Sequence, residues 1–465
     1  MNKVVPPPIL IPGKSVLATA VVMILILAVL LSGCSNSRSA AMASLAPPMI
    51  TSAAASTPRA KTDSAHFSKN FFSAFPLVRL QVGSDARGRA GNDETLEFLF
   101  DTGNAGLSVV DVSVAQRLGL ELVPAGSISF AGVTLPTLRA KADRVQLLNN
   151  DKAEKRLLLR DISFQVVDLT PFAELAGRRV DGILGRDIIS RFVTTVDYQQ
   201  QSVIFGNQTV TRPAASPSAT ASVAPSARPA GDNEIQKQGS RIIMPFELRD
   251  GWIVVKTHLN GGLSEEMILD TGASITTFSQ DRARLLGFDV SRARPTTLIL
   301  PIGRLTYLPY RMREIEFGGL KLDDAASVVV ATRDGLFTAG TGMSLLGANV
   351  LRHFRLTIDY GRRQLTLERN DSFDKDPHEY TSIGVLPMLR DGRFYVSGVV
   401  NGSPADDEGV EIGDEIIELG GRKMDEYSFS DLVDALRGPD GSSLDITVRR
   451  GQRIIDLNLK RVPLL

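Results

Sequence analysis

Two aspartates are the residues best suited to chemistry, because each begins the same three-residue turn. Asp101 and Asp270 are each followed by Thr-Gly, and apolar runs precede them at residues 96–100 and 267–269. We therefore expect each carboxylate at the end of a buried strand. Two carboxylates held close together share one proton, so one can take a proton from water while the other hydrogen-bonds a carbonyl. The residues that support these turns are Thr102, Gly103, Thr271 and Gly272.

The surroundings of the two aspartates also repeat, which indicates a duplicated module. Each copy continues with an alanine, a Leu-Gly pair, an apolar-apolar-Gly segment, a phenylalanine and an apolar-Asp-Tyr segment. The first copy places them at Ala115, 118–119, 183–185, Phe192 and 196–198, and the second at Ala283, 286–287, 345–347, Phe354 and 358–360. The offset between copies is 169 residues at the aspartates and 162 at the later glycines.

At these residues the chain resembles the aspartic peptidases, specifically their retropepsin-like bacterial branch, with two lobes in one chain as in the pepsin-like branch. The resemblance covers residues 72–207 and 238–369. It implies a mainly β fold of two tandem acid-protease β-barrel lobes, each supplying one catalytic aspartate, and an endopeptidase that needs no metal or other cofactor. Asn104 departs from the Ser, Thr or Ala typical of the family, whereas Ala273 fits. The Asn104 amide either donates to the outer oxygen of Asp101 or crowds the turn.

The resemblance also implies flaps, which close over substrate and exclude water. Residues 127–138, around Gly132, have the pattern of paired short strands in the first lobe. No tyrosine occurs before Tyr198 in that lobe, although the pepsin-like branch carries a flap tyrosine. The corresponding residues 298–310 of the second lobe contain Gly303, Tyr307 and Tyr310, and the sequence leaves open which of them covers the cleft.

The N-terminal residues predict export and a lipid anchor. Residues 16–31 form an apolar run that leads into Leu-Ser-Gly-Cys at residues 31–34, and this tetrapeptide resembles the bacterial lipoprotein box. We expect a signal peptide at residues 1–33, lipidation of Cys34 and a disordered tether at residues 34–70. The alternative is an N-terminal signal anchor with an incidental cysteine. The predicted location is the bacterial cell envelope, facing the periplasm, and Ser35 favours the outer membrane.

A Pro/Ala/Ser-rich stretch at residues 208–236 separates the two predicted lobes, at residues 71–207 and 237–370. A flexible linker of about 25 residues spans roughly 25–30 Å, about the width of a small domain. The two lobes are therefore expected to pair within one chain.

Residues 381–465 contain Ser-Pro-Ala at 403–405, Gly409 and Gly-Asp at 413–414. With these residues the segment resembles the bacterial PDZ domains. A groove helix is expected at residues 430–436 and strands at 444–448 and 454–459. Glu408 replaces the alanine usual at its position. PDZ domains add an extended peptide to a sheet edge, so protein or peptide partners are expected there. The peptide-binding loop is predicted at Ile383, Gly384 and Val385. The alternative is a domain that only packs against the lobes.

Other chemistries find little support. Lys plus Arg and Asp plus Glu both total 52, which argues against a nucleic-acid partner. The four histidines lack metal-ligand spacing, and there is no phosphate-binding glycine loop. Asp187 and Asn349 are expected to cap short helices, and Asp197 and Asp359 to be structural residues of a turn or a strand end. The leading hypothesis is an envelope aspartic endopeptidase with substrate capture by the PDZ domain, and the rival is a non-catalytic binding or scaffold lipoprotein.

Overall fold

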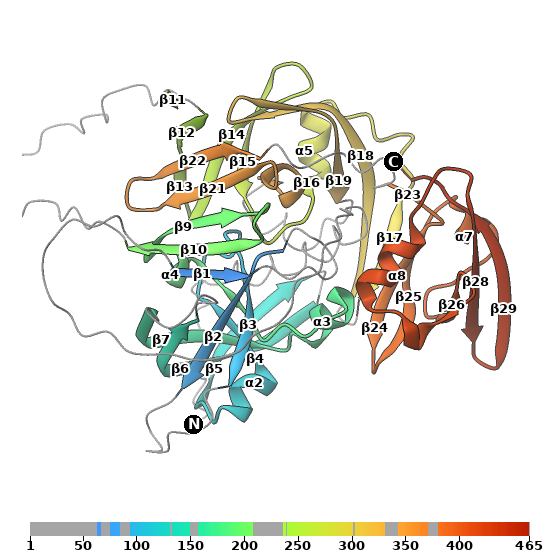
Figure 1. The fold of residues 1–465 in the computed structure, drawn as a ribbon, viewed down its shortest axis with the longest axis horizontal. Helices are drawn as coiled ribbons and strands as arrows, with labels where there is room; N and C mark the ends of the chain where they lie inside the picture. The colour runs from blue at the N-terminus through green and yellow to red at the C-terminus, as the bar shows by residue number, and fades with distance from the viewer. Residues whose placement is uncertain are drawn as a thin grey trace, which may run out of the picture.

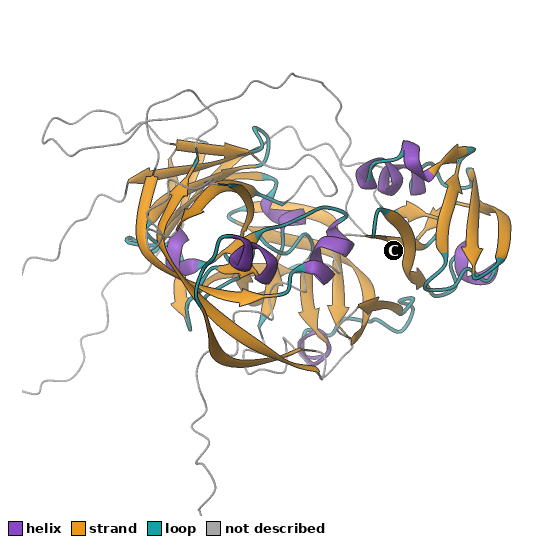
Figure 2. Ribbon diagram, turned by 90° about the horizontal axis from the view of Figure 1, so that it is seen from below, coloured by secondary structure: helices purple, strands orange, loops and turns teal. Residues whose placement is uncertain are grey.

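The protein, seen in a computed structural model, is mainly β, with two β lobes and a C-terminal domain (Figures 1 and 2). The structure describes residues 63–66, 75–83, 94–130, 133–148, 157–207, 236–238, 240–300, 303–330, 343–370 and 380–464. The predicted signal peptide, Cys34 and most of the tether and linker lie outside these residues. In the described parts, no helix is long and apolar enough to cross a bilayer.

The first lobe is one curved sheet whose order is β2-β3-β8-β4-β7-β6-β5, and an additional pairing of β2 with β6 closes it on itself. Its strands are β2 (Leu77–Gly83), β3 (Thr95–Phe100), β4 (Val109–Asp111), β5 (Leu122–Phe130), β6 (Val133–Leu147), β7 (Leu157–Val167) and β8 (Gly182–Leu184). Its helices are α2 (Val112–Arg117), α3 (Thr170–Ala176) and α4 (Arg186–Ile189). The predicted flap is the β5–β6 hairpin.

The second lobe repeats the order of these seven strands, as the duplication predicted, and adds β13 beside β14. Its order is β14-β15-β20-β16-β19-β18-β17, and a β14–β18 pairing closes it where β2–β6 closes the first lobe. Its strands are β13 (Glu247–Arg249), β14 (Trp252–Leu259), β15 (Leu263–Leu269), β16 (Thr276–Ser279), β17 (Thr296–Leu300), β18 (Gly303–Phe317), β19 (Leu320–Val330) and β20 (Ser344–Leu346), with helices α5 (Gln280–Leu285) and α6 (Ala348–Leu351). The corresponding flap hairpin is β17–β18.

A separate seven-stranded sheet joins the lobes, in the order β1-β10-β9-β21-β22-β12-β11. Its strands are β1 (Asp63–His66), β9 (Phe192–Asp197), β10 (Ser202–Asn207), β11 (Gln236–Gln238), β12 (Arg241–Pro245), β21 (Phe354–Asp359) and β22 (Gln364–Arg369). At its centre β9 pairs antiparallel with β21, and Thr195 lies opposite Thr357 with their hydroxyl oxygens 2.8 Å apart. These two threonines are 162 residues apart, so the local two-fold axis that relates the lobes passes between them.

Strand β1 corrects one boundary, because it lies inside the tether expected at residues 34–70. Asp63–His66 pairs with β10 at the edge of the interlobe sheet. An edge strand needs only backbone N–H and C=O groups, so a polar composition does not prevent it. The tether prediction is therefore wrong for these four residues.

The C-terminal domain has the elements that its sequence predicted. Helix α8 (Phe429–Leu436) begins at Ser428, whose hydroxyl forms a capping box with Asp431. Glu408 is exposed after α7 (Pro404–Asp407), so it does not disturb the core. The strands are β23 (Thr381–Ser382), β24 (Val385–Arg390), β25 (Arg393–Val400), β26 (Glu415–Leu419), β27 (Arg422–Lys423), β28 (Ser443–Arg450), β29 (Arg453–Lys460) and β30 (Val462–Pro463), with a 3-10 turn at Met424–Glu426.

The C-terminal domain is attached to both lobes rather than suspended from them. Flap strand β17 of the second lobe pairs antiparallel with β25, with Leu298 opposite Gly398. Helix α3 of the first lobe lies beside β24 (Figure 1). One buried apolar cluster runs through all three units and includes Phe172, Leu298 and Phe429. The C-terminal domain thus packs against both lobes, whereas the alternative that packing is its only role stays a prediction.

Candidate active site

Equivalent strand pairs bring the two aspartates to the interface between the lobes. Asp101 follows β3, which runs parallel to β8, and its N–H donates to the Leu184 carbonyl at 3.2 Å. Asp270 follows β15, which runs parallel to β20, and its N–H donates to the Leu346 carbonyl at 3.1 Å. Each Asp-Thr-Gly turn thus begins where a buried central strand ends, as the sequence predicted.

The glycines of the two turns allow the carboxylates to approach. A Cβ atom on Gly103 would lie 2.5 Å from Cγ of Asp270, and one on Gly272 would lie 2.4 Å from Oδ1 of Asp101. The glycine N–H groups also bind the carboxylates, since Gly103 donates to Asp101 Oδ1 and Gly272 to Asp270 Oδ1, each at 2.8 Å. Any side chain at either glycine would collide with the aspartate of the opposite lobe.

The two threonines lock the turns to one another. The N–H of Thr102 donates to Oγ1 of Thr271 at 3.1 Å, and the N–H of Thr271 donates to Oγ1 of Thr102 at 3.0 Å. Each hydroxyl in turn donates across the interface, Thr102 to the Leu269 carbonyl at 2.8 Å and Thr271 to the Phe100 carbonyl at 2.9 Å. Four buried hydrogen bonds between lobes therefore fix the separation of the aspartates.

The environment of the pair favours a shared proton. Both aspartates are fully buried, and within the described chain no N–H or O–H group outside the pair donates to either Oδ2 atom. Burial raises the pKa of Asp101 well above its usual value, and the negative charge of Asp270 raises it further. Burial also raises the pKa of Asp270. One proton held between the two carboxyl groups is the arrangement that water activation requires.

Asp187 and Asn349 do not cap helices, which corrects the sequence-based expectation. Gly185 and Gly347 hold the cap positions, and neither cap has a side-chain hydrogen bond. Asp187 Oδ1 instead accepts from the N–H and the hydroxyl of Ser108, at 2.8 and 2.7 Å. Asn349 Oδ1 accepts in the same way from Thr276, at 2.8 and 3.0 Å.

These cross-links steady the segments next to the aspartates. The Ser108 hydroxyl also accepts from the N–H of Gly185, at 2.9 Å, and the Thr276 hydroxyl from the N–H of Gly347, at 3.3 Å. Each lobe thereby ties the chain after its Asp-Thr-Gly turn to the chain after its apolar-apolar-Gly segment. Asp197 and Asp359 end strands β9 and β21, as predicted.

Asn104 does neither of the two things considered for it. Its Nδ2 atom donates to the Leu107 carbonyl at 3.1 Å, and its Oδ1 atom accepts from the N–H of Gly106 at 3.1 Å. Only its backbone N–H reaches Oδ1 of Asp101, at 3.2 Å. The amide side chain closes the turn on itself and leaves the first aspartate in the same geometry as the second.

Trp252 is a site residue that the sequence reasoning missed. Its indole Nε1 donates to the Gly103 carbonyl at 2.7 Å, so a side chain from the second lobe holds the Asp-Thr-Gly turn of the first. The side chain is buried, and it is the chain's one tryptophan. A lone tryptophan directly after a turn at Asp250-Gly251 was the available signal.

The flap tyrosines are engaged in packing. Tyr307 is fully buried in the cluster shared with the C-terminal domain. Tyr310 stacks on Phe288, with ring centroids 4.5 Å apart and an interplanar angle of 11°. Neither tyrosine is therefore available as a cleft-covering residue in this conformation, and Gly132 lies outside the described residues.

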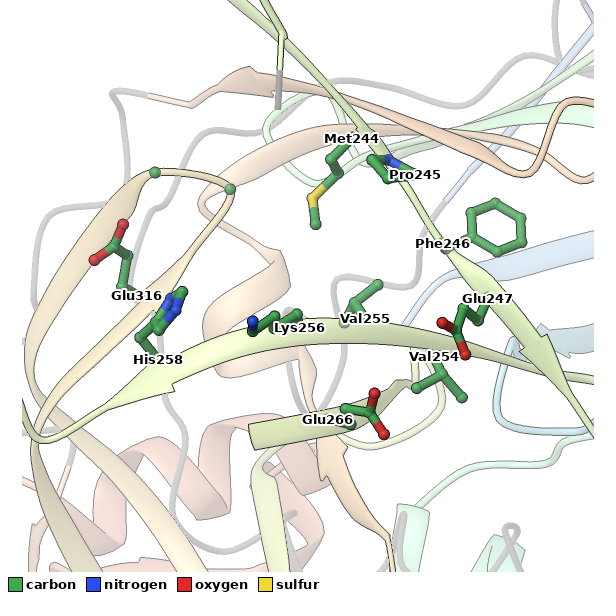
Figure 3. A pocket seen from close by; sticks show the side chains of 12 residues that line it. Met244, Pro245, Phe246, Glu247, Val254, Val255, Lys256, His258, Glu266 and Glu316 are labelled. Carbon is green, nitrogen blue, oxygen red and sulfur yellow. The ribbon is translucent and has the colours of Figure 1, made fainter. Parts of the chain in front are cut away.

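A hollow of about 400 Å³ lies away from the aspartates, between β12, β14 and the β18–β19 turn (Figure 3). Apolar side chains such as Met244 and Phe246 line one part, and Lys256, His258 and Glu316 line another. Over the described ranges, no group of three or more metal-ligating residues occurs.

The predicted peptide-binding loop sits beside the end of α8. The Ile383 carbonyl accepts from the N–H of Ala405 at 3.0 Å, and the Gly384 carbonyl from that of Val400 at 2.9 Å. Gly384 has φ +92°, and a Cβ there would lie 2.0 Å from the Ser403 hydroxyl. Val385 begins strand β24, which leads away along α8. The loop geometry needs a glycine at residue 384.

Comparisons with known proteins agree with this architecture. Residues 87–188 and 255–350 match the family model described as aspartyl protease, and residues 395–450 match the PDZ domain model. A probable CtpA-like serine protease of Staphylococcus aureus is 26% identical over 98 residues, which is 21% of this chain and 20% of that protein. The carboxy-terminal processing protease CtpA of Bacillus subtilis is 29% identical over 96 residues, 20% and 21% of the two chains. The chain thus spans about a fifth of the length of these curated relatives.

Among solved structures, a retropepsin-like aspartic protease from Rickettsia conorii aligns with 24% identity and a TM-score of 0.22, over 27% of this chain and 89% of that chain. A photosystem II D1 C-terminal processing protease aligns with 23% identity and a TM-score of 0.18, over 18% of this chain and 24% of that chain.

Both lobes are therefore aspartyl protease domains, and the C-terminal domain is a PDZ domain.

Proposed function

We propose that this protein is an aspartic endopeptidase whose single active site is formed by Asp101 and Asp270 of one chain. The observation that carries the proposal is the buried carboxylate pair, whose turns are locked by reciprocal threonine hydrogen bonds. A carboxyl pair that shares one proton can act as base and acid together, so the nucleophile is a water molecule between the two carboxyl groups.

The reaction follows from one shared proton. The ionised aspartate takes a proton from the water, whose oxygen bonds to the scissile carbonyl carbon, while the protonated aspartate hydrogen-bonds the carbonyl oxygen. Proton transfer to the amide nitrogen then breaks the C–N bond, and the amine and carboxylic acid products leave. The pair regains its single proton, so atoms and charge balance over the cycle.

We further propose that the substrates are proteins of the cell envelope, captured in part through the PDZ domain, and that lipidated Cys34 tethers the enzyme with its lobes facing the periplasm. The apolar run at residues 16–31 and the Leu-Ser-Gly-Cys segment support the anchor. Replacing Cys34 with alanine should abolish palmitate labelling and detergent-phase partition. A variant that is still labelled would contradict the anchor without touching the peptidase proposal.

Cleavage of fluorescein-labelled unfolded casein tests the catalytic proposal. The Asp270→Asn variant should lose at least about 100-fold in rate, because an amide cannot act as the base or carry the shared proton. Asp289→Asn is the matched control, since Asp289 is an exposed carboxylate of the same lobe. Equal rates for wild type and Asp270→Asn would refute the proposal, and no cleavage by wild type would favour the non-catalytic binding protein.

A further inference from the structure

The peptide groove of the PDZ domain lies between β24 and α8, and its two ends are distinguishable. Near the Ile383–Val385 loop, the Ser382 hydroxyl donates to the Leu436 carbonyl at 3.2 Å, so the last turn of α8 adjoins this end. The other end is bounded by Arg390, the last residue of β24, and Phe429, the first residue of α8. A bound peptide would place its carboxylate at the loop and extend towards Arg390 and Phe429.

One edge of β24 lacks a strand partner among the described residues. Strand β25 pairs with the other edge along its whole length, from Val385 opposite Val399 to Arg390 opposite Arg393. Among the described strands, none pairs with the remaining edge. An added peptide strand needs this edge, because its affinity comes from main-chain hydrogen bonds.

Helix α3 of the first lobe lies against β24 (Figure 1). Its contacts fall at the end of the groove that Arg390 and Phe429 bound. Glu174 and Arg390 form a bidentate ion pair with two 3.0 Å contacts. Gly177, which ends α3 with φ +58°, packs so closely on Phe429 that a Cβ there would lie 2.0 Å from the ring carbon Cγ. Phe172 and Leu175 are buried in the same apolar cluster as Met388 of β24.

We propose that α3 occupies the PDZ peptide site in cis, as a latch, and that peptides with a free C-terminal carboxylate bind only after displacing it. This inference rests on the proposed role of the PDZ domain in peptide capture, and it is independent of cleavage at the aspartates. The apparent affinity of the groove is its intrinsic affinity multiplied by the fraction of molecules in which α3 is undocked. A peptide that replaces α3 should have apolar side chains that pack on Met388 and Phe429. It should also have an acidic residue, further from its C-terminus, that pairs with Arg390.

The substitution Gly177→Ala is a wedge against Phe429 that should release the latch. Gly287→Ala is the matched control, because Gly287 has a similar φ of +69° but no atom within 4 Å of the added Cβ. The probe is a fluorescein-labelled peptide selected on the full-length Gly177→Ala protein from a displayed library of heptapeptides with random free C-termini. Its C-terminal amide is the negative control.

The Gly177→Ala protein should bind the probe at least tenfold more tightly than wild type, and Gly287→Ala should match wild type. In wild type, saturating probe should raise amide hydrogen exchange at residues 170–177, which reports undocking of α3. This measurement needs no variant, so it holds even if the Gly177→Ala protein folds poorly. Equal affinity of wild type and Gly177→Ala, or unchanged exchange at residues 170–177, would overturn the latch. A library that yields no carboxylate-dependent peptide would overturn the groove as a peptide site, while the casein assay would still report separately on the aspartates.

Discussion

Replacing Thr271 with valine should separate the lobes at the catalytic turns. Valine has nearly the shape of threonine but cannot accept from the N–H of Thr102 or donate to the carbonyl of Phe100. Both backbone groups are buried at the interface, and a buried polar group that loses its partner costs about 1–3 kcal/mol. Thr271→Val should therefore lower the free energy of unfolding by about 2–6 kcal/mol.

The matched control is Thr271→Ser, which keeps the hydroxyl and removes one methyl group. Loss of a buried methyl group costs about 0.8 kcal/mol, so the serine variant should be the milder of the two. Urea unfolding followed by circular dichroism measures both values, and casein cleavage reports the separation of the aspartates. Valine and serine variants of equal stability and activity would refute the reasoning, because the hydrogen bonds would then contribute nothing beyond packing.

Three further predictions concern charge and domain contacts. Burial raises the folded-state pKa of Asp101, so its contribution to stability is complete below the unfolded pKa and is lost as pH rises through the folded one. The free energy of unfolding should accordingly fall from pH 4 to pH 8, and Asp101→Asn should flatten that fall. Burial likewise raises the pKa of Asp187 to about 6, so replacing it with the neutral Asn should stabilise the protein at pH 8. The fold should tolerate Asp187→Asn, because Asn349 makes the same contacts in the second lobe. Deletion of residues 380–465 should lower the melting temperature of the lobes, since it uncovers Phe172 and Leu298, which are buried against the PDZ domain.

Specific results would contradict each of these predictions. An Asp101→Asn protein with the wild-type dependence of stability on pH would show that the carboxyl group is not desolvated. An Asp187→Asn protein that unfolds more easily than wild type at pH 8 would show that a charge is required beside Ser108. A truncated protein with an unchanged melting temperature would show that the PDZ contact is weak.

The parts of the fold that the sequence predicted are those encoded by local pattern. Apolar runs before Asp101 and Asp270 placed both strand ends, and repeated segments at constant offsets predicted two lobes of one topology. The resemblance to PDZ domains placed the groove helix at residues 430–436, and α8 spans Phe429–Leu436. In each case the signal lies within a few residues of the structure it determines.

The features that the sequence did not predict depend on distant packing. The sequence predicted Asp187 as a helix cap because Asp and Asn favour that position. Its carboxylate instead accepts hydrogen bonds from Ser108, which is 79 residues away in the chain. Trp252 and Gly103 meet only because the lobes pair. The addition of β17 to β25 and the docking of α3 on β24 require surfaces whose complementarity no single segment displays.

A mixing experiment tests most directly whether the two aspartates of one chain form one active site. Asp101→Asn and Asp270→Asn should each be inactive on casein, because the remaining carboxylate cannot serve as both acid and base. The lobes are covalently linked and share a continuous interlobe sheet, so exchange between chains is disfavoured. An equimolar mixture of the two purified variants should therefore stay inactive. Recovery of a substantial fraction of wild-type activity on mixing would show that the site assembles between chains and would contradict the account.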